Sequence, residues 1–289
     1  MPDVPTRPGT FAAARLPGIG LVLAGQAGYQ LRLLTRTPRA LWLAIFVPAG
    51  VLALRLGHTS DVGSHPGAGS AVYALVAGLA VFGLLNTAYM THASGLVSAR
   101  QDGVLRRWRL TPLPAGGYFA GRIAATVLLA DAGGALVILT GAAMAGVRVS
   151  ASATLILLAT LSAGALAWAA LGTAVTIVVP TAEAAFPVLS LTYLPVIFLS
   201  GAFGAFAGEP NWLTTLIRYL PAQPLVEAVT WALRPSASGL AAFPGRDLAV
   251  LAAWGAAGLL VSVRFFRWNP QRPAHGRHQP SRPTGSMGH

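Results

Sequence analysis

Long runs of apolar residues alternate with short polar stretches along most of this chain. Six of these runs are predicted to be membrane-spanning helices: Ala40–Leu56, Ala71–Ala93, Ile123–Ala145, Leu155–Val179, Ala184–Phe206 and Leu248–Phe265. A helix needs about 20 predominantly apolar residues to cross the hydrocarbon core of a bilayer. The first run is short and contains Pro48, so we expect it either to kink or to thin the bilayer locally. The fifth contains Pro187 and Pro195, and we expect these prolines to break it.

An amphipathic stretch, Ile19–Thr37, precedes the first apolar run. Arg32 and Arg36 lie away from its apolar stripe, which consists of Leu23, Ala27, Leu31 and Leu34. This pattern predicts a helix that lies in the membrane interface. The alternative, a solvated helix packed on a soluble domain, is weaker because the chain has little soluble sequence on which such a helix could pack.

A second amphipathic region, Ala207–Arg246, precedes the last run. Its apolar residues recur at helical spacing in two short segments, which Pro221 and Pro224 separate: Trp212, Leu213, Leu216, Ile217 and Leu220, then Leu225, Val229 and Ala232. Two amphipathic turns beside a broken span predict a re-entrant hairpin that dips into the outer leaflet. A loose external loop is the alternative, which the interfacial positions of Trp212 and Trp231 disfavour.

Composition agrees with a membrane protein. The chain has 289 residues, of which 54% are hydrophobic and only 10% charged, whereas a soluble domain has about 25% charged residues. All 20 basic residues are arginine, and the net charge is +12. The arginines stand in short clusters between apolar runs, which is typical of membrane topology signals, so no nucleic-acid partner is expected.

The arginines are distributed unequally between the two sides of the predicted spans. With the N-terminus inside, fifteen lie on the inner side: Arg7, Arg15, Arg32, Arg36, Arg39, Arg100, Arg106, Arg107, Arg109, Arg122, Arg264, Arg267, Arg272, Arg277 and Arg282. Five lie outside: Arg55, Arg148, Arg218, Arg234 and Arg246. This bias predicts a multi-pass protein of the cytoplasmic (inner) membrane with both termini in the cytoplasm.

The sequence as a whole predicts an all-α integral membrane protein with one transmembrane domain at 19–267. Residues 1–18 are rich in Pro and Gly, and we expect them to be irregular. Residues 268–289 are polar and Pro-rich, and we expect a disordered cytoplasmic tail.

Residues with catalytic potential are few. Asp131 lies inside the third run, where an ionisable residue is a functional hypothesis by default. Close helix packing with a hydrogen-bond partner explains it equally well. His58 and His65 are weak candidates for metal ligands, and His92 is more typical of a structural histidine. Because the chain lacks lysine, it cannot form a P-loop ATP site, and we expect no catalytic, cofactor or metal site.

The most informative polar stretch is Arg100–Arg122, RQDGVLRRWRLTPLPAGGYFAGR. Asp102 and Gly103 favour a turn, Val104–Leu110 can form a short helix, and Thr111-Pro112 ends it. Leu105 and Trp108 share one side of this helix, and the basic residues around them are Arg106, Arg107 and Arg109. An aromatic anchor with a basic rim indicates a docking element for another protein; the alternative is that the arginines only fix topology.

RQDGVLRRWRLTPLP resembles the R-x-(E/D)-G-x-L-x-(R/K)-x-x-x-T-P-L-P pattern of ABC-2 type permeases, the membrane subunits of bacterial ABC exporters. FLSGAFGAF and EPNWLTTLIRYLPAQPLVEAV resemble two later segments of the same family, and the likeness runs from Ala40 to about Arg267. It is most similar to the drug-export branch. Two departures from the family pattern, at Ala205 and Phe206 and at Leu225 and Glu227, affect the outer hairpin and do not touch the cytoplasmic motif.

The resemblance implies half of an exporter for drugs, natural products or lipid-like molecules, without an ATPase of its own. Two permeases, as a homodimer or a heterodimer in the membrane lipid, would act with separate ATP-binding subunits that bind ATP and Mg²⁺. The implied coupling residues are Asp102, Gly103, Leu105, Arg106, Arg107, Trp108, Arg109, Thr111 and Pro112. The implied residues of the outer hairpin and gate are Phe198, Ser200, Gly201, Phe203, Pro210, Trp212, Leu213, Pro221 and Glu227. Two alternatives remain, a secondary transporter that uses Asp131 as its coupled carboxylate and a non-transporting scaffold.

Overall fold

The computed structural model describes scattered residues between 20 and 32, and then residues 47–57, 68–110, 115–145, 151–200, 210–234 and 244–266. Within these ranges every regular element is a helix, and no described residue lies in a strand. The all-α fold class predicted from the sequence is therefore confirmed. In the predicted interfacial segment, the described residues are helical and mostly exposed.

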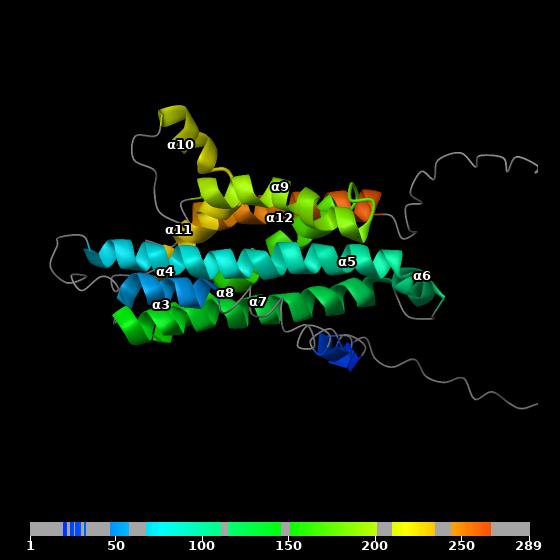
Figure 1. The fold of residues 1–289 in the computed structure, drawn as a ribbon, viewed down its shortest axis with the longest axis horizontal. Coiled ribbons are helices and arrows are strands. Elements are labelled where there is room, and N and C mark those ends of the chain that lie inside the picture. The colour runs from blue at the N-terminus through cyan, green and yellow to red at the C-terminus, as the bar shows by residue number, and fades with distance from the viewer. Residues whose placement is uncertain are drawn as a thin grey trace, which may run out of the picture.

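The described helices form an elongated bundle (Figure 1). In chain order they are α3 (Val47–Gly57), α4 (Ala68–Leu85), the π-helix η2 (Asn86–Thr91), α5 (His92–Gln101), α6 (Val104–Arg109), α7 (Ala115–Ala145), α8 (Ala151–Val175), α9 (Ala182–Leu199), α10 (Asn211–Ile217), α11 (Ala222–Leu233) and α12 (Gly245–Phe265).

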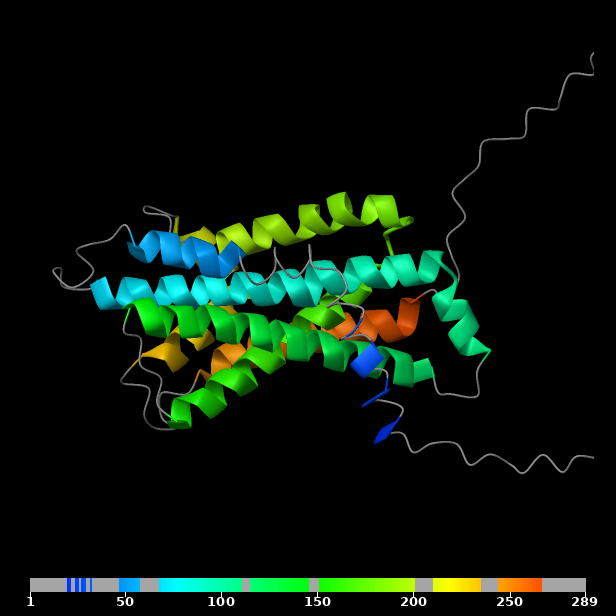
Figure 2. The ribbon, with the colours of Figure 1, turned by 60° about the horizontal axis from the view of Figure 1, so that its bottom comes forward.

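Five helical stretches in the described part of the chain are long and apolar enough to cross a membrane: Ala71–Gln101, Gly117–Met144, Ala153–Val175, Ala182–Leu199 and Gly245–Phe265. They lie side by side along the long axis of the molecule and alternate in direction (Figures 1 and 2). The structure is thus that of a multi-pass membrane protein. The first predicted span is described only from Val47, in α3, and its residues 40–46 lie outside the described ranges.

The second span is longer than predicted and is not uniform. Helix α4 continues through the π-helical turn η2 into α5, and the stretch Ala71–Gln101 is one rod of 31 residues. Helix α7 likewise begins at Ala115 rather than at Ile123. As a result Arg100 and Arg122, which the sequence placed in a basic loop, both lie inside helices, and that expectation is wrong.

Helix α9 corrects a second expectation, because it runs without a break through Pro187 and Pro195. Its buried residues are spaced four apart, on a single stripe: Ala185, Leu189, Tyr193 and Ile197. Each proline removes one backbone hydrogen bond, but membrane helices tolerate this loss where neighbouring groups compensate. Packing of the buried stripe therefore keeps the helix continuous. The remainder of the predicted run, residues 201–206, lies outside the described ranges.

A continuous apolar core joins α3, α4, η2, α7, α8, α9, α11 and α12. Helices α8 and α12 approach most closely, because a Cβ added at Gly258 would stand 2.8 Å from the backbone nitrogen of Leu171. At one end of the bundle α11 packs against α4 and α8, with Leu225 and Val229 fully buried and Glu227 exposed. The end where α6 lies is the opposite one (Figure 1). We call these the α11 end and the α6 end.

Candidate functional site at the α6 end

The turn between α5 and α6 follows directly from its two residues. The Asp102 amide donates to the Ser98 carbonyl over 2.8 Å, and the Gly103 amide donates to the Arg100 carbonyl over 3.2 Å. Gly103 has φ of 71° and lies in the left-handed region, which glycine adopts without a Cβ penalty. This left-handed residue ends α5 and starts α6 at once, so the chain turns sharply at the end of the bundle.

The apolar side of α6 packs inward, against its own chain. Leu105 is fully buried in a small cluster with Leu96 and Tyr118, and the half-buried Trp108 lies with its ring centroid 5.6 Å from that of Tyr118. The spacing of Leu105 and Trp108 predicted that both side chains dock on another protein. For Leu105 this is wrong, because its side chain has no exposed surface left for a partner. Both side chains pack α6 against α5 and α7.

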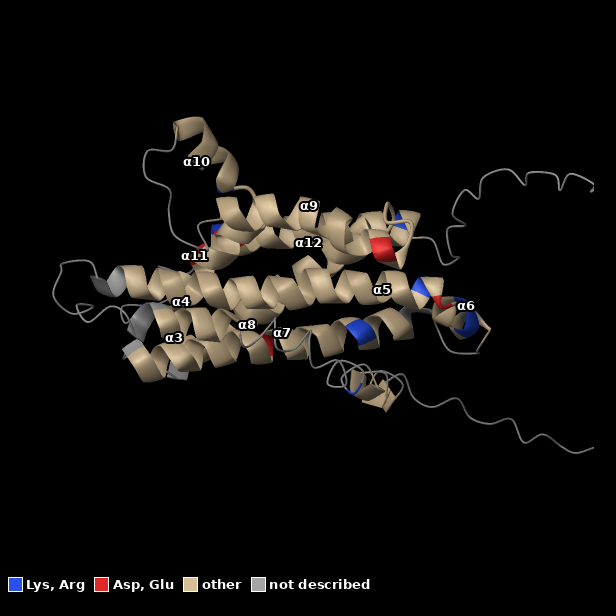
Figure 3. Ribbon diagram, in the orientation of Figure 1, with Lys and Arg blue, Asp and Glu red and all other residues tan. Residues whose placement is uncertain are grey.

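The opposite side of α6 faces outward and carries the exposed residues Arg106, Arg107 and Leu110. Leu110 is 82% exposed, although it is a large apolar residue. One bond steadies this surface, since Arg107 Nη2 donates to the Asp102 carbonyl over 3.2 Å. Positively charged residues gather at this end of the molecule (Figure 3). The side chain of Arg109 and the residues Thr111 and Pro112 lie outside what the structure describes.

Beneath the turn, the side chain of Arg100 is buried and only 2% of it is exposed. Its Nη1 donates to the Thr176 carbonyl over 2.9 Å, and its Nη2 donates to the Val179 carbonyl. These carbonyls follow the end of α8, where backbone oxygens lack helical donors and carry partial negative charge. Arg100 therefore caps α8. Removing it would leave the Val179 carbonyl without this donor, at a cost of about 1–3 kcal/mol, whereas the Thr176 carbonyl would keep its bond from the Val179 amide.

The neighbouring residue, Gln101, reaches the start of α9. Its Oε1 accepts a hydrogen bond of 2.7 Å from the Ala182 amide. Thr181 is the N-cap of α9 and accepts from the Ala184 amide over 3.3 Å, and Glu183 places a carboxylate in the first turn. Two consecutive residues of α5 thus hold the end of one helix and the start of the next.

A buried polar cluster lies deeper in the bundle, where η2 passes into α5. His92 is 2% exposed, and its Nδ1 and Nε2 each lie 3.0 Å from a threonine Oγ1, of Thr126 on α7 and of Thr173 on α8. Arg122 Nη2 donates to the His92 carbonyl over 3.1 Å. A Cβ at Gly95 would collide with the Arg122 guanidinium. Three helices are therefore joined by polar contacts around one imidazole.

The profile of the ABC-2 type transporter family matches residues 28–233. This match covers more than half of the 289 residues. The chain belongs to the ABC-2 type transporter family. It is accordingly a permease subunit of an ABC transporter, a membrane component without an ATPase site of its own, and the family implies an ABC ATP-binding partner. No curated protein matches the chain.

In this permease, Asp131 lies at the contact between α7 and α8. Its Oδ2 accepts a hydrogen bond of 2.6 Å from Ser162 Oγ on α8, and its Oδ1 is buried without a partner among the described residues. The bond joins the two helices, as the structural interpretation of this residue expects. His58 and His65 lie outside the described ranges, within which no group of three or more metal-binding side chains occurs.

Most of the described residues predicted for the hairpin and gate of the permease lie at its α11 end. Pro210 is the N-cap of α10, Trp212 is 68% exposed, Leu213 is half-buried and Pro221 precedes α11. Glu227 is exposed, and its Oε1 accepts from Gln223 Nε2 over 2.7 Å.

Phe198 and Ser200 end α9; Phe198 is half exposed, and the Ser200 hydroxyl is buried and bonds the Ile197 carbonyl. Gly201 and Phe203 lie outside the described residues.

One anchor of this end was not predicted from the sequence. Trp254 Nε1 on α12 donates to the Tyr219 carbonyl over 2.7 Å, and the Arg246 guanidinium lies 5.4 Å from the centroid of the Tyr219 ring. The link between α10 and α11 is thereby tied to α12. Only the aromatic character of Tyr219 and Trp254 was visible in the sequence, because their hydrogen bond joins positions 35 residues apart.

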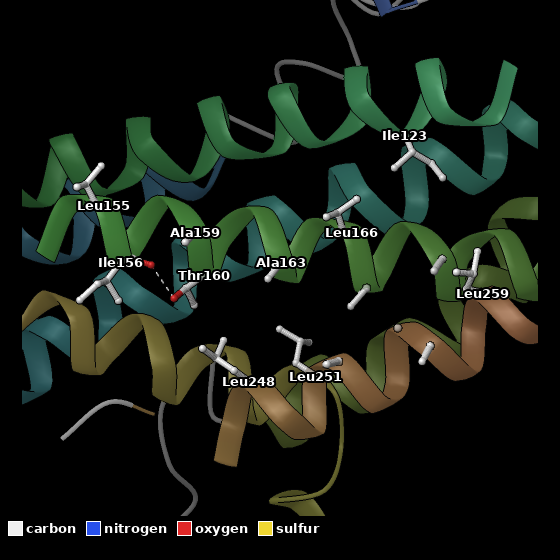
Figure 4. A pocket seen from close by; sticks show the side chains of 15 residues that line it. Ile123, Leu155, Ile156, Ala159, Thr160, Ala163, Leu166, Leu248, Leu251 and Leu259 are labelled. Carbon is white, nitrogen blue, oxygen red and sulfur yellow. Dashed lines mark hydrogen bonds between the residues drawn. The ribbon is translucent and has the colours of Figure 1, made fainter. Parts of the chain in front are cut away.

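An apolar groove of about 900 Å³ runs between α8 and α12 of the permease and reaches Ile123 on α7 (Figure 4). Leu155 and Leu166 line it from α8, and Leu248 and Leu259 line it from α12. Small residues such as Ala163 and Gly255 create the space. Among the described residues that line the groove, none is charged, so the groove suits hydrocarbon better than a polar ligand.

Proposed function

We propose that this permease is the membrane subunit of an ATP-driven exporter, which carries hydrophobic or amphipathic molecules (a drug, a natural product or a lipid-like compound) out of the cytoplasm. A separate ATP-binding subunit binds ATP and Mg²⁺ and supplies the energy. The observation that carries this proposal is the surface of α6. It combines an exposed apolar residue with exposed arginines on a helix whose other side is firmly packed.

The docking surface in this proposal consists of Arg106, Arg107 and Leu110. Exposed charges mainly steer and orient a partner, whereas an apolar residue that becomes buried supplies most of the affinity. Leu105 and Trp108 hold the helix from behind. Because its buried side is packed on α5 and α7, α6 can stay attached to the bundle when a partner exerts a force on its exposed side.

The cargo and the assembly follow from the apolar surfaces. The groove along α8 and α12 has no charged lining, which supports a hydrophobic rather than an ionic substrate. Helix α9 exposes Phe186, Leu191 and Phe198 by 71%, 77% and 50%. We infer that a second permease, identical or related, covers part of this face, and that membrane lipid covers the rest. We further infer that the protein resides in the inner membrane, with the α6 end and both termini in the cytoplasm.

Co-purification with the candidate ATP-binding subunit tests the docking surface. We expect Leu110→Ala to weaken binding about tenfold or more, the effect of removing a buried leucine side chain from an interface. This effect should depend little on salt, whereas the weaker effect of Arg107→Ala should change with salt because exposed charges are screened over about 10 Å at 0.1 M. Leu155→Ala is the matched control, since Leu155 is 72% exposed and lies in the first turns of α8, whereas the α6 end contacts the residues that follow the opposite end of α8.

Normal binding and normal stimulation of ATP hydrolysis by Leu110→Ala, Arg106→Ala and Arg107→Ala would contradict the docking role. The basic loop would then act only in membrane topology.

A secondary transporter is the second candidate function, and the unpartnered Oδ1 of Asp131 favours it. Asp131→Asn keeps the shape of the side chain and removes its charge. In the exporter, transport by this variant should still require ATP and should remain close to normal. If Asp131→Asn abolishes transport while the Leu110 variant transports normally, the ion-coupled mechanism replaces the exporter.

A further inference from the structure

The docking surface lies directly beyond the residues that hold α8 and α9 together. We propose that Arg100 and Gln101 link α6 mechanically to the α8–α9 connection (residues 176–181), so that a push on α6 displaces α9. This inference rests on the proposed function, because the push comes from the ATP-binding subunit. Beyond the proposed function, the inference identifies the residues that transmit the movement, Arg100 and Gln101, and the helix that moves in response, α9.

Arg100 holds two points of the connection with one side chain. The Thr176 and Val179 carbonyls both accept from the same guanidinium, at positions three residues apart. Pro180 follows and has no amide hydrogen of its own to offer to a backbone carbonyl. The rigid planar fork of arginine can hold two acceptors in a fixed relative orientation, which the single ammonium group of lysine cannot do.

Gln101 holds the other side of the connection, through the 2.7 Å bond from the Ala182 amide. Arg100 and Gln101 therefore grip the end of α8 and the start of α9 from neighbouring positions at the end of α5. Because α5 also packs directly against α8 and α9, a displacement of its last turn acts on the connection itself.

The turn between this grip and α6 has little freedom. Asp102 and Gly103 are bonded back to α5, the Arg107 amide donates to the Gly103 carbonyl over 3.0 Å, and the Arg107 guanidinium bonds the Asp102 carbonyl. Both ends of the turn are thus fixed to the helices that flank it. The last turn of α5, the connecting turn and α6 form one unit, and a push on α6 is not absorbed in a hinge.

Helix α9 is the element that this unit can displace. Its buried residues form the single stripe of Ala185, Leu189, Tyr193 and Ile197. Besides the bond to Gln101, its polar contacts with the bundle include the hydrogen bond between Thr192 and Tyr89 and the bond from the Tyr193 hydroxyl to the Phe82 carbonyl. Helix α8 is held on more sides than α9, because it packs on α5, α7, α11 and α12, whereas α9 packs on α5, η2 and α11. The close contact with Gly258 and the polar contacts of Thr173 and Ser162 add to this hold on α8. A force on residues 176–181 therefore moves α9 relative to α8 and α12.

Pulsed EPR distances test the link on the full chain in lipid nanodiscs, since the sequence contains no cysteine. One label pair, at Arg106→Cys and Phe186→Cys, reports the distance between α6 and α9 in the permease alone and leaves the Arg107 bond to Asp102 intact. We expect one narrow distribution, which becomes broader or shifts when Arg100→Gln or Gln101→Ala is added. Arg264→Gln is the matched control, because it removes a charge from the same end but breaks no contact with the connection.

A second pair, at Phe186→Cys and Phe265→Cys, reports the distance between α9 and α12 in the complex with the ATP-binding subunit. ATP with vanadate should change this distance in the otherwise unaltered chain and in Arg264→Gln. In Arg100→Gln and Gln101→Ala we expect the change to be lost while the ATPase still binds and hydrolyses ATP. Arg100→Lys should recover only part of the change. If Arg100 had only a structural role, Arg100→Gln would instead reduce folding and ATPase binding together.

Unaltered α6–α9 distributions in both variants would overturn the proposal, as would an α9 movement that survives in both. Gln101→Ala changes an exposed side chain, so it keeps the test valid if Arg100→Gln fails to fold. Failure of the ATP-binding subunit to bind even the unaltered chain would refute the proposed function instead, and the first label pair would still decide whether the link exists.

Discussion

Gly103 is the one residue with positive φ among those that the structure describes, at 71°. A Cβ added there would meet no atom within 4 Å, so only backbone conformation resists a substitution. We expect Gly103→Ala to destabilise the turn by about 1–2 kcal/mol. Asn tolerates the left-handed region better, and Gly103→Asn should lose less. Protease cleavage within the turn would measure both. Equal protection of the Ala and Asn variants would show that the turn does not depend on this conformation.

In the cluster around His92, two threonine side chains stabilise the fold by providing hydrogen-bond partners for the buried imidazole. Thr126→Val and Thr173→Val each leave one buried nitrogen of His92 without its partner. We expect each change to lower the free energy of unfolding by about 1–3 kcal/mol. Thr140→Val is the control, because the Thr140 hydroxyl bonds only the Leu136 carbonyl of its own helix. Thermal unfolding in detergent measures all three, and equal midpoints would show that the cluster contributes nothing to stability.

Close packing of helices gives a prediction at the scale of elements. A Cβ at Gly258 would stand 2.8 Å from Leu171 N and 2.9 Å from Ala170 C, and these backbone atoms cannot turn aside. Gly258→Ala must therefore separate α12 from α8 and should cost about 1–3 kcal/mol or more, as overpacking does elsewhere. At Gly134 the nearest atoms are 3.6 Å away on Leu161, so Gly134→Ala should be tolerated. Thermal stability of the two variants compares them directly, and equal losses would contradict the close α8–α12 contact.

The helices themselves were largely visible in the sequence, since each span is a long apolar run that needs no distant partner to be recognised. Errors arose where tertiary contacts decide the outcome. Pro187 and Pro195 predicted a break, but the buried stripe of α9 keeps that helix continuous. The π-helical turn Asn86–Thr91 has no distinctive composition that would reveal it.

Tertiary contacts also limited what could be predicted about the candidate site. Spacing placed Leu105 and Trp108 together on one face of α6, but it could not show that this face packs on the chain itself. Arg100 was read as a loop charge, because its acceptors lie 76 and 79 residues further along the chain. Local sequence therefore identified the docking segment, and only the fold revealed which of its residues face outward.

On the scale of the whole molecule, the two ends of the bundle differ in character. The α6 end carries an exposed basic helix whose base is hydrogen-bonded to α8 and α9. The α11 end is closed by an amphipathic helix that packs into the bundle and is tied to α12 through Tyr219 and Trp254. This difference fits the proposed exporter, in which the ATP-binding subunit would act at one face of the membrane and substrate would leave at the other.

The last prediction concerns which end of the bundle faces the cytoplasm. The sequence assigns 15 of the 20 arginines, Arg106 and Arg107 of α6 among them, to the inner side of the predicted spans, which predicts that the α6 end is cytoplasmic. Single cysteines at Leu110 and at Thr215 on α10 would report the two ends, since both side chains are exposed and the chain has no other thiol. In intact cells that express the permease without the ATP-binding subunit, so that Leu110 is not covered, an impermeant thiol reagent should label Thr215→Cys and spare Leu110→Cys, and it should label both after permeabilisation. Ser281→Cys should behave as Leu110→Cys does if the C-terminal segment is also inside. Labelling of Leu110→Cys but not of Thr215→Cys in intact cells would invert the topology. An ATP-binding subunit in the cytoplasm could then not reach α6, and the exporter proposal would fail together with the link from α6 to α9.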